Sequence, residues 1–286
     1  MCRCGVTEPF ALQGFDLAGF VSATLAEDMG EGGDRTSAAV IPADAVLDAV
    51  LDSRDAVTVA GLPIAAAFFR ALDPACTIEI LVPEGASVPA GTDLMRIRGK
   101  ARALLTAERS ALNTVQHLTG IATLTRSYVD AIAGTGAILL DTRKTLPGLR
   151  ALEKYATRTG GATNHRMRLD DGVMIKDNHI AVAGGVEAAV HAAKAAGLRD
   201  VVVEVDTLDQ IPPALAAGAD RLLLDNMPPP MLRQALALVA GRVPTEASGG
   251  VNLQTIRAIA ETGVTYISVG RITQSAPAAD IGLDFA

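Results

Sequence analysis

The sequence predicts an α/β protein whose C-terminal part is an open or nearly closed (β/α) barrel of about six to seven units, preceded by a smaller α/β domain. Two observations predict the barrel. From about residue 137, short apolar runs recur, each ends in a polar residue, and each precedes a helical segment. Glu204, Asp225 and Glu246 are then spaced 21 residues apart, which fits one strand, one helix and two short loops. Such units form parallel strands with right-handed crossovers.

The first 115 or so residues mix strand-like and helix-like stretches. Short runs of apolar and β-branched residues predict strands at Val46–Val50, Ala56–Ala60 and Thr77–Val82. A helix is expected over Ile64–Leu72, because Pro63 stands where a helix would begin. Thr106–Ala133 is a long helical stretch, which we expect Gly120 to divide into two helices.

Barrel strands are expected wherever an apolar run is followed by a polar residue. These runs are Ile138–Leu140, Val173–Ile175, Val201–Val203, Leu222–Leu224, Thr245 and Tyr266–Val269. They end at Asp141, Lys176, Glu204, Asp225, Glu246 and Gly270. Barrels of this type place their chemistry at the C-terminal ends of the strands, so these residues predict a site. We therefore assign residues 1–115 to the N-terminal domain and 116–275 to the barrel, with 276–286 returning to the N-terminal domain.

Composition excludes several classes of protein. Hydrophobic residues make up 49% of the chain, which excludes intrinsic disorder, and no segment approaches the ~20 apolar residues of a membrane span. A net charge of −7 with 3% aromatic residues argues against nucleic acid as a partner. Three cysteines, an odd number, form no disulfide framework and indicate a reducing, cytoplasmic setting. Cys2 and Cys4 are too close in sequence for a zinc pair, so we expect a frayed N-terminus. We expect no signal peptide, because the first 25 residues lack a basic start followed by an apolar run.

The charge is unevenly distributed along the chain. Residues 141–179 carry a net charge of +3, whereas the remainder carries −10. Arg143-Lys144, Asn164-His165-Arg166 and Lys176 all stand at predicted strand ends. Cations that converge in this way repel one another unless an anion offsets the cost, so they predict a pocket for a small polyanion. Three further basic residues at helical spacing predict a solvated stripe: Arg150, Lys154 and Arg158.

Two glycine-bearing strand ends predict phosphate contacts. Ser248-Gly249-Gly250 follows Glu246 and opens onto a helix that begins near Asn252. Backbone N–H groups that remain free at such a turn form a cradle for phosphate. A second loop, Gly270-Arg271-Ile272-Thr273, follows one unit later, and barrel phosphate sites often use the last strand loops.

Several segments, in order, resemble the quinolinate phosphoribosyltransferase family and cover most of the chain from about residue 30. They are Gly33-Asp34 with Thr36-Ser37, Glu108-Arg109-Ser110-Ala111-Leu112-Asn113, the run from Asp141 to Arg150, Asn164-His165-Arg166, Ile175-Lys176-Asp177-Asn178-His179, Leu224-Asp225-Asn226, Glu246-Ala247-Ser248-Gly249-Gly250 and Ile267-Ser268-Val269-Gly270. One loop departs from the family: Arg271-Ile272-Thr273-Gln274 stands where Ala-Leu-Thr-His is usual.

The resemblance implies an N-terminal α/β sandwich domain and a C-terminal open α/β barrel. It implies transfer of the phosphoribosyl group of 5-phosphoribosyl 1-pyrophosphate to quinolinate, with decarboxylation, to give nicotinate mononucleotide in NAD biosynthesis. Mg²⁺ is the implied cofactor. The implied assembly is a homodimer or a larger homo-oligomer, in which Arg109 reaches the site of the neighbouring subunit.

Site residues follow from the resemblance position by position. Quinolinate would be held by Arg143, His165, Arg166 and Lys176. The ribose, the pyrophosphate and Mg²⁺ would face Lys144, Glu204 and Asp225, and the metal contacts of Glu204 and Asp225 would pass directly or through water. The 5-phosphate would be held by Ser248, Gly249, Gly250, Gly270, Arg271 and Ile272, and Thr142 would also contact substrate. The implied catalytic residues are Lys144, Lys176, Glu204 and Asp225.

The absence of a Ser-His-Asp or Cys-His arrangement fits this chemistry, because a pyridine nitrogen already has a free lone pair and needs no base to make it a nucleophile. Three other interpretations stay open. One is the molybdenum-transport-associated relative of the family, although Asn164-His165-Arg166 and the run from Ile175 to His179 favour the quinolinate enzyme. A second is a Schiff-base aldolase with Lys176 as nucleophile, and the third is a binding protein that has lost activity.

Overall fold

The computed structural model describes residues 10–285, so the predicted frayed segment with Cys2 and Cys4 lies outside the described residues. The chain forms two compact units. Residues up to Thr123, Ala151–Gly160 and the residues from Ala276 onward form the N-terminal unit. Leu124–Arg150 and Gly161–Ser275 form the barrel unit. Within residues 10–285, no helix is both long enough and apolar enough to cross a membrane.

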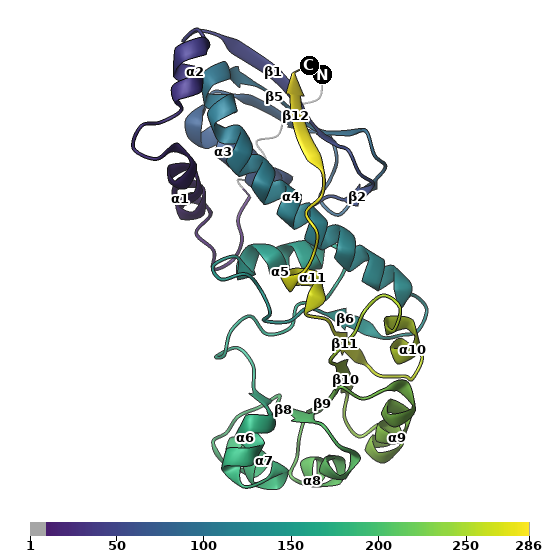
Figure 1. Ribbon diagram of the computed structural model, residues 1–286. Coiled ribbons are helices and arrows are strands. Elements are labelled where there is room, and N and C mark those ends of the chain that lie inside the picture. The colour runs from purple at the N-terminus through teal and green to yellow at the C-terminus, as the bar shows by residue number, and fades with distance from the viewer. Residues whose placement is uncertain (1–9, 286) are drawn as a thin grey trace, which may run out of the picture. The chain divides into compact units, whose positions relative to one another are not determined.

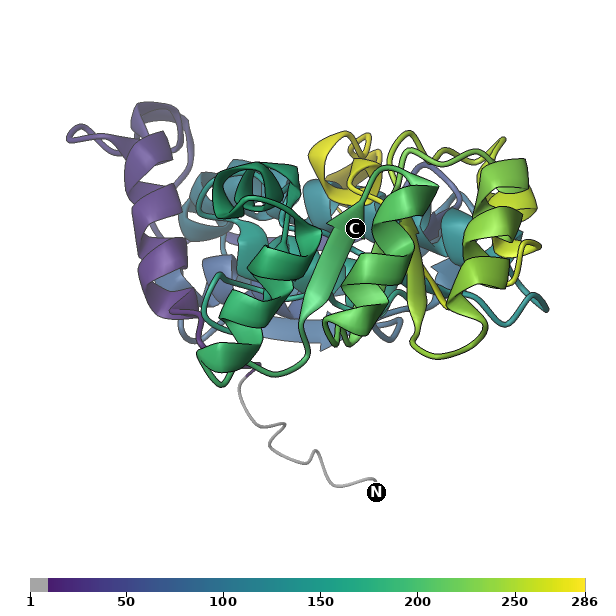
Figure 2. The same cartoon turned by 90° about the horizontal axis from the view of Figure 1, so that it is seen from below.

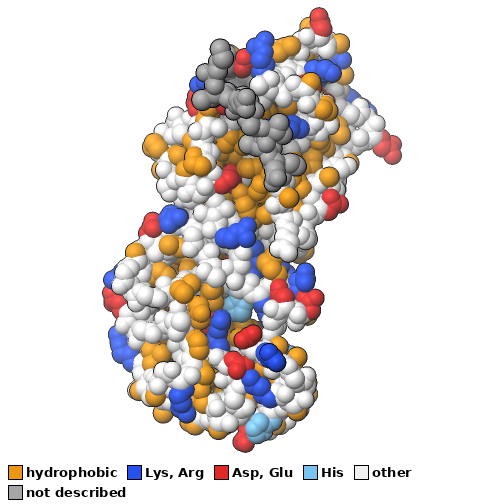
Figure 3. Space-filling model, turned by 180° about the vertical axis from the view of Figure 1, so that it is seen from behind, with side chains coloured by type: hydrophobic (Ala, Val, Ile, Leu, Met, Phe, Trp, Pro, Cys, Tyr) orange, Lys and Arg blue, Asp and Glu red, His pale blue; other side chains and the backbone are white. Residues whose placement is uncertain are grey.

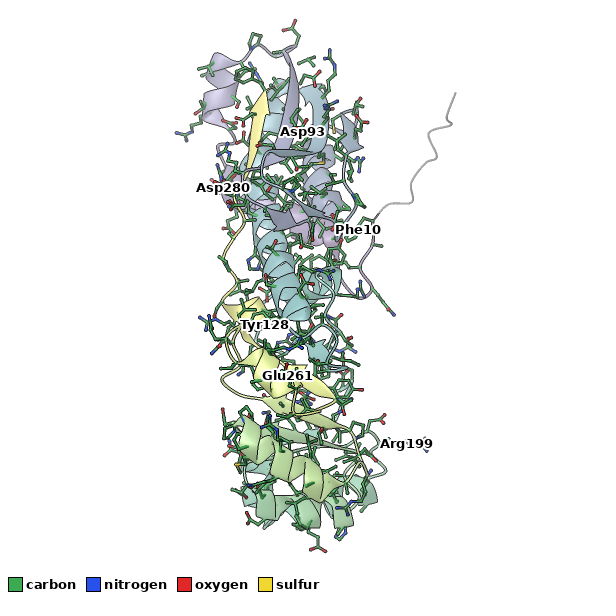
Figure 4. The ribbon with its side chains drawn as sticks, turned by 90° about the vertical axis from the view of Figure 1, so that its right-hand side faces the viewer. Phe10, Asp93, Tyr128, Arg199, Glu261 and Asp280 are labelled. Carbon is green, nitrogen blue, oxygen red and sulfur yellow. The ribbon has the colours of Figure 1, made fainter. Side chains whose placement is uncertain are left out.

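The N-terminal unit is built on an antiparallel sheet of four strands. Its order is β12 (Ile281–Phe285), β1 (Val46–Ser53), β5 (Thr92–Lys100) and β3 (Thr77–Ile80). A smaller sheet pairs β2 (Val57–Thr58) with β4 (Ser87–Val88). The helices of this unit are α1 (Leu17–Met29), α2 (Arg35–Val40), α3 (Leu62–Leu72) and most of α4 (Ala101–Ala131) and of α5 (Arg150–Thr159). The last residues of α4, from Leu124, belong to the barrel unit. Figure 1 shows the yellow strand β12 beside β1, and Asp280, labelled in Figure 4, immediately precedes this returning strand.

The predicted helix over Ile64–Leu72 is confirmed as α3, and its start has a clear physical cause. Gly61 adopts a left-handed conformation (φ 101°) before the helix, and Pro63 occupies its first turn. The Glu84 carboxylate accepts the N–H groups of Gly61 and Leu62 at 2.6 and 3.0 Å. These N–H groups have no partner within the helix, so the carboxylate stabilises the N-terminus.

The predicted break at Gly120 is wrong, because α4 runs without interruption from Ala101 to Ala131. A side chain at Gly120 would collide with the backbone carbonyl of Pro277, which leads into β12. The glycine therefore allows two backbones to approach each other closely. Its cost within a helix is about 1 kcal/mol, which a long, well-packed helix tolerates.

The strand predictions of this unit are correct in place but not in extent. The predicted strand from Val46 continues to Ser53, whereas β2 and β3 are shorter than expected. The strands β4, β5 and β12 were not predicted from the sequence. In β5, Met95 and Ile97 are buried while Arg96 and Arg98 are exposed, which is the alternation of a strand with one face in water.

The solvated stripe predicted for Arg150, Lys154 and Arg158 is also wrong. Residues 152–157 of α5 are all buried, and the side chain of Lys154 is 1% exposed. Only Arg158 of the three is exposed. The helix is packed on nearly all sides in the N-terminal unit, to which residues 151–160 belong although they lie between barrel elements in the sequence. The spacing of residues along one helix could not predict that other segments of the chain would bury this helix.

The barrel unit contains a parallel sheet of six strands, which confirms the predicted open α/β barrel. Its order is β6 (Ile138–Leu140), β11 (Tyr266–Ser268), β10 (Thr245–Ser248), β9 (Arg221–Asp225), β8 (Val202–Val205) and β7 (Met174–Ile175). The helices are α6 (Asp177–Ala183), α7 (Val186–Ala195), the 3₁₀ helix η1 (Leu208–Gln210), α8 (Ile211–Ala216), α9 (Pro229–Val239), α10 (Ile256–Ala260) and α11 (Arg271–Gln274). The strands form an arc with helices outside it (Figure 1), and Figure 2 shows the green helices side by side.

Two acidic residues that were expected to follow their strands lie within them. Glu204 is the third residue of β8, and Glu246 is the second residue of β10. Both are paired in register with Leu223 of β9, so these residues form one layer inside the barrel. The apolar side chains of the same strands, such as Val203 and Ala247, belong to the hydrophobic core. Alternation along each strand therefore turns the acids toward the barrel interior.

Candidate active site

A cavity of about 710 Å³ opens at the C-terminal ends of the barrel strands. Its lining residues come from loops and strands throughout the barrel unit, including the ends of β8, β9 and β10. Figure 3 shows a hollow on this unit with basic, acidic and histidine side chains around it. Thirteen of the predicted site residues line the cavity: Thr142, Arg143, Lys144, His165, Arg166, Lys176, Glu204, Asp225, Ser248, Gly249, Gly250, Gly270 and Arg271.

Asp141 holds two loops of the site together. Its carboxylate is fully buried at the end of β6. Oδ1 accepts the backbone N–H of His165 at 2.8 Å, and Oδ2 accepts the side-chain amide of Asn164 at 2.6 Å. Thr163 also forms a parallel bridge with Leu140, so the segment continues the sheet beyond β6. The two basic motifs of the sequence, which are about 20 residues apart, are thus fixed next to each other.

Arg143 and Arg166 form the basic side of the cavity. The Arg166 guanidinium donates through Nη1 to the carbonyl of Gly172 at 2.8 Å. Burial and the neighbouring Arg143 guanidinium lower the pKa of Arg166 from its ordinary value. Two guanidinium groups this close repel each other, and an anion between them would remove that cost. Their planar forks suit a carboxylate that accepts two parallel hydrogen bonds.

The acidic side of the cavity lies on the neighbouring strands β8 and β9. Lys176 donates a hydrogen bond from Nζ to Oε2 of Glu204, and the two form an ion pair. Asp225 ends β9 and accepts the Asn226 side-chain amide at 2.6 Å. Ser248 is paired in register with Asp225, which brings the glycine loop to the same edge of the barrel. The cavity therefore presents cations, carboxylates and a turn of backbone N–H groups to a single ligand.

Two glycines of the loops have close neighbours. Gly249 has φ of 88°, and a side chain there would collide with the side chain of Asn226. Any side chain at Gly270 would place its Cβ 2.7 Å from Cδ of Lys144. Thr273 Oγ1 donates to the carbonyl of Lys144 at 2.7 Å, so the last barrel loop supports the lysine from its backbone. The unusual loop from Arg271 to Gln274 forms the short helix α11 and keeps this arrangement.

Two predicted site residues do not line the cavity. Ile272 is fully buried and belongs to the hydrophobic core of the barrel unit, so its side chain contributes packing. Arg109 lies on α4 in the N-terminal unit and is exposed. Its role in the site of a neighbouring subunit stays a prediction.

Several lining residues were given no individual role by the family resemblance. They are Met174, Leu223, Asn226, Glu246, Val251, Ser268, Val269, Gln274 and Ser275. Asn226 and Glu246 belong to the family-like segments Leu224-Asp225-Asn226 and Glu246-Ala247-Ser248-Gly249-Gly250, so the sequence carried a signal for both. Ser268 and Val269 lie in the family-like segment Ile267-Ser268-Val269-Gly270. The other apolar residues carry no such signal, because nothing in the sequence distinguishes an apolar side chain in the cavity from one in the core.

Both parts of the chain match one known family. Residues 34–119 match the N-terminal domain of quinolinate phosphoribosyl transferase, and residues 121–284 match its C-terminal domain. The chain belongs to the quinolinate phosphoribosyl transferase family. The nicotinate-nucleotide pyrophosphorylase (carboxylating) of Mycobacterium leprae is 43% identical over 266 residues, which cover 91% of this chain and 94% of that protein.

Other members of the quinolinate phosphoribosyl transferase family agree over similar lengths. Quinolinate phosphoribosyltransferase (decarboxylating) 1b of Nicotiana tabacum is 40% identical, with coverage of 97% of this chain and 85% of that protein. The structure of the nicotinate-nucleotide pyrophosphorylase from Francisella tularensis has a TM-score of 0.89 and 39% identity. The superposition covers 94% of this chain and 96% of the Francisella tularensis chain, so the likeness extends over both units.

Proposed function

We propose that the chain transfers the phosphoribosyl group from 5-phosphoribosyl 1-pyrophosphate to quinolinate. The products are nicotinate mononucleotide, pyrophosphate and CO₂. The observation that carries the proposal is one cavity that combines a pair of guanidinium groups, two carboxylates and two glycine-bearing loops. The names of the relatives, which describe nicotinate-nucleotide pyrophosphorylases and quinolinate phosphoribosyltransferases, support the same reaction.

Quinolinate carries two neighbouring carboxylates on a pyridine ring. Arg143 and Arg166 would bind them, with His165 and Lys176 beside them in the cavity. Paired guanidinium groups supply both charge and direction, which fixes the plane of the ring and aims its nitrogen at the ribose. Orientation of this kind is the main contribution that the protein makes, since the ring nitrogen is already a nucleophile.

The reaction exchanges one bond at the ribose carbon for another. The ring nitrogen forms a bond to C1 of the ribose while the bond from C1 to the pyrophosphate oxygen breaks. Glu204 and Asp225 would stabilise the positive charge that builds on the ribose, and Lys144 would stabilise the departing pyrophosphate. The positive charge of the resulting pyridinium then stabilises the electron pair that stays on the ring carbon when the adjacent carboxylate leaves as CO₂, and that carbon takes up a proton from solvent.

Mg²⁺ is part of the proposal as a companion of the phosphoribosyl substrate. No group of three or more His, Cys, Asp or Glu side chains arranged to hold a metal occurs within residues 10–285. Mg²⁺ usually keeps several waters and binds through one or two carboxylates plus substrate phosphates, and Glu204 and Asp225 fit that pattern. When bound there, the ion would neutralise charge on the pyrophosphate. The 5-phosphate would lie against Ser248-Gly249-Gly250 and the loop from Gly270.

The finer features of assembly and location are also proposals. A homodimer or larger homo-oligomer, in which Arg109 is donated across the interface, accords with the exposure of Arg109 on α4. A cytoplasmic location accords with the odd number of cysteines, which gives no disulfide framework.

The decisive experiment incubates the protein with quinolinate, 5-phosphoribosyl 1-pyrophosphate and Mg²⁺ and looks for nicotinate mononucleotide. Omission of each component in turn should abolish the product, and failure of the complete mixture to form it would refute the proposal. Turnover also excludes a binding protein without activity. Borohydride with carbonyl substrates tests the aldolase alternative, in which Lys176 would be trapped. We expect no trapping, because Lys176 is paired with the Glu204 carboxylate and the proposed reaction forms no Schiff base.

A further inference from the structure

Glu246 is a buried carboxylate at the floor of the cavity to which the reaction described above assigns no task. It is fully buried in β10, in register with Leu223 on one side and Tyr266 on the other. It nevertheless belongs to the residues that line the cavity. Burial of an ionised carboxylate is costly unless several partners compensate for it, so such a group requires an explanation.

A histidine and an arginine side chain approach the same oxygen of this carboxylate. Oε2 of Glu246 lies 3.3 Å from Nε2 of His165 and 3.4 Å from Nη1 of Arg221. Arg221 itself lies over the ring of Tyr266, with its guanidinium carbon 4.3 Å from the ring centre. Burial alone would raise the pKa of Glu246, but hydrogen bonds from His165 and Ser268 and the charge of Arg221 bring it below its ordinary value. The group is therefore an anion facing His165.

The hydrogen bond at the other ring nitrogen of His165, Nδ1, determines which nitrogen carries the proton. Nδ1 accepts the backbone N–H of Arg166 at 2.8 Å, so Nδ1 carries no proton of its own. The ring proton is then on Nε2, the nitrogen that lies 3.3 Å from Oε2 of Glu246. The backbone N–H of His165 is held at the same time by the buried Asp141. The hydrogen bonds at the backbone N–H and at Nδ1 of His165 together fix the backbone that leads into Arg166.

We propose that Glu246 is a positioning residue for recognition of the pyridine dicarboxylate. The negative charge of its carboxylate, 3.3 Å from Nε2, favours the tautomer of His165 that carries the ring proton on Nε2. Nδ1 is then left to accept the Arg166 N–H, which fixes the start of the Arg166 side chain. The far end of that side chain is fixed by Gly172. The guanidinium thereby reaches the substrate in one direction. This inference rests on the proposed function only for the identity of the dicarboxylate, because the tautomer can be measured without any substrate.

The second oxygen of Glu246 suggests the alternative that the experiment must exclude. Oε1 is buried and has no hydrogen-bond partner among residues 10–285. A ribose hydroxyl that entered the cavity could donate to it, and Glu246 would then touch the phosphoribosyl substrate itself. The two roles differ in which substrate loses affinity when the carboxylate is removed.

The tautomer is tested first, by NMR of the full-length protein with ¹⁵N-labelled histidine. The chain has four histidines, so the signals of His165 can be identified by their absence from the His165→Asn variant. We expect an unprotonated Nδ1 and a protonated Nε2 in the wild-type protein. In Glu246→Gln we expect the Nδ1–H form to appear, because the amide can present its NH₂ group to Nε2. A protonated Nδ1 in the wild-type protein would overturn the inference, whether or not the protein turns over quinolinate.

Steady-state kinetics then separate positioning from direct contact. We expect Glu246→Gln to raise the KM for quinolinate about tenfold, equivalent to about 1.4 kcal/mol. The KM for 5-phosphoribosyl 1-pyrophosphate and kcat should stay within about twofold of wild type. The matched control is Asp220→Asn, which changes a carboxylate at the opposite end of the strands that is bound to Lys194. It should leave all three constants unchanged.

A double-mutant cycle with His165→Asn completes the test. Asn keeps an acceptor near the position of Nδ1 but cannot reach Glu246, so Glu246→Gln should add less than about a twofold effect in that background. Independent, multiplicative effects of the two substitutions would overturn the inference. So would an increase in KM for 5-phosphoribosyl 1-pyrophosphate with unchanged KM for quinolinate. If Glu246→Gln does not fold, the wild-type spectrum still tests the tautomer. The His165→Asn kinetics then test the link from the imidazole to quinolinate affinity, and an unchanged KM for quinolinate in that variant would refute it.

Discussion

Arg150 connects the two loops that carry the guanidinium groups of the site, and its removal should weaken quinolinate binding. Nε donates to Oγ1 of Thr145 and Nη1 to the carbonyl of Met167, both at 3.0 Å. A longer contact of 3.5 Å joins Nη2 to the carbonyl of Arg143. One side chain therefore ties the loop of Arg143 to the loop that follows Arg166, although Arg150 itself does not line the cavity.

The expected magnitude follows from the two short hydrogen bonds. A hydrogen bond to a charged group contributes about 1.5–3 kcal/mol. Because Arg150 is partly exposed, we take the lower end for each bond, which gives about 3 kcal/mol for the connection. In Arg150→Met, quinolinate binding would have to order both loops. The dissociation constant should then rise by up to roughly 100-fold. Lysine can reach one acceptor but not both, so Arg150→Lys should lie between methionine and wild type.

Isothermal titration calorimetry with quinolinate measures this effect directly. Arg158→Met is the matched control, because it removes an exposed arginine from the other end of α5. It should bind quinolinate with wild-type affinity. Unchanged affinity in Arg150→Met, or an equal loss in Arg158→Met, would refute the role of Arg150 as the connection between the loops.

Three further outcomes are expected from the proposed reaction. Arg143→Ala or Arg166→Ala should weaken quinolinate binding by about 2–5 kcal/mol, the cost of leaving one member of a buried charged pair alone, and unchanged affinity in calorimetry would contradict the assignment. Asp225→Asn should lower turnover more than quinolinate affinity, whereas equal effects on both would argue against a role at the ribose. Subunits carrying Arg109→Ala, mixed with subunits inactivated by Lys176→Ala, should recover part of the activity, because one site in each mixed dimer would be intact. No recovery would indicate that Arg109 acts within its own subunit.

The sequence predicted the barrel because its signals are local and repeated. An apolar run that ends in a polar residue recurs from Ile138 to Gly270, and each run became a strand of the parallel sheet. The limits of the strands were less certain. Glu204 and Glu246 marked strand ends in the sequence but lie inside strands, since a polar residue can also point into the barrel when the cavity supplies a partner.

Predictions failed where distant segments determine the outcome. Gly120 resembles a helix break until the carbonyl of Pro277, more than 150 residues later, is placed against it. Lys154 has the spacing of a solvated stripe, but α5 packs within the N-terminal unit and buries it. β12 forms only because the chain returns to pair with β1. In each case the deciding neighbour is remote in sequence, so no local pattern could reveal it.

The sequence by itself determined the type of fold, the family and most of the residues around the cavity, because strand-end residues and glycine-bearing loops are written in short motifs. Only the tertiary structure decided how these residues act on one another. It showed that Lys176 pairs with Glu204 and that Asp141 holds the segment of His165. It also showed that Glu246 lies 3.3 Å from His165 and that Arg150 bonds to both loops that carry the guanidinium groups. Such contacts depend on side-chain direction and distance across strands, which a one-dimensional pattern does not contain.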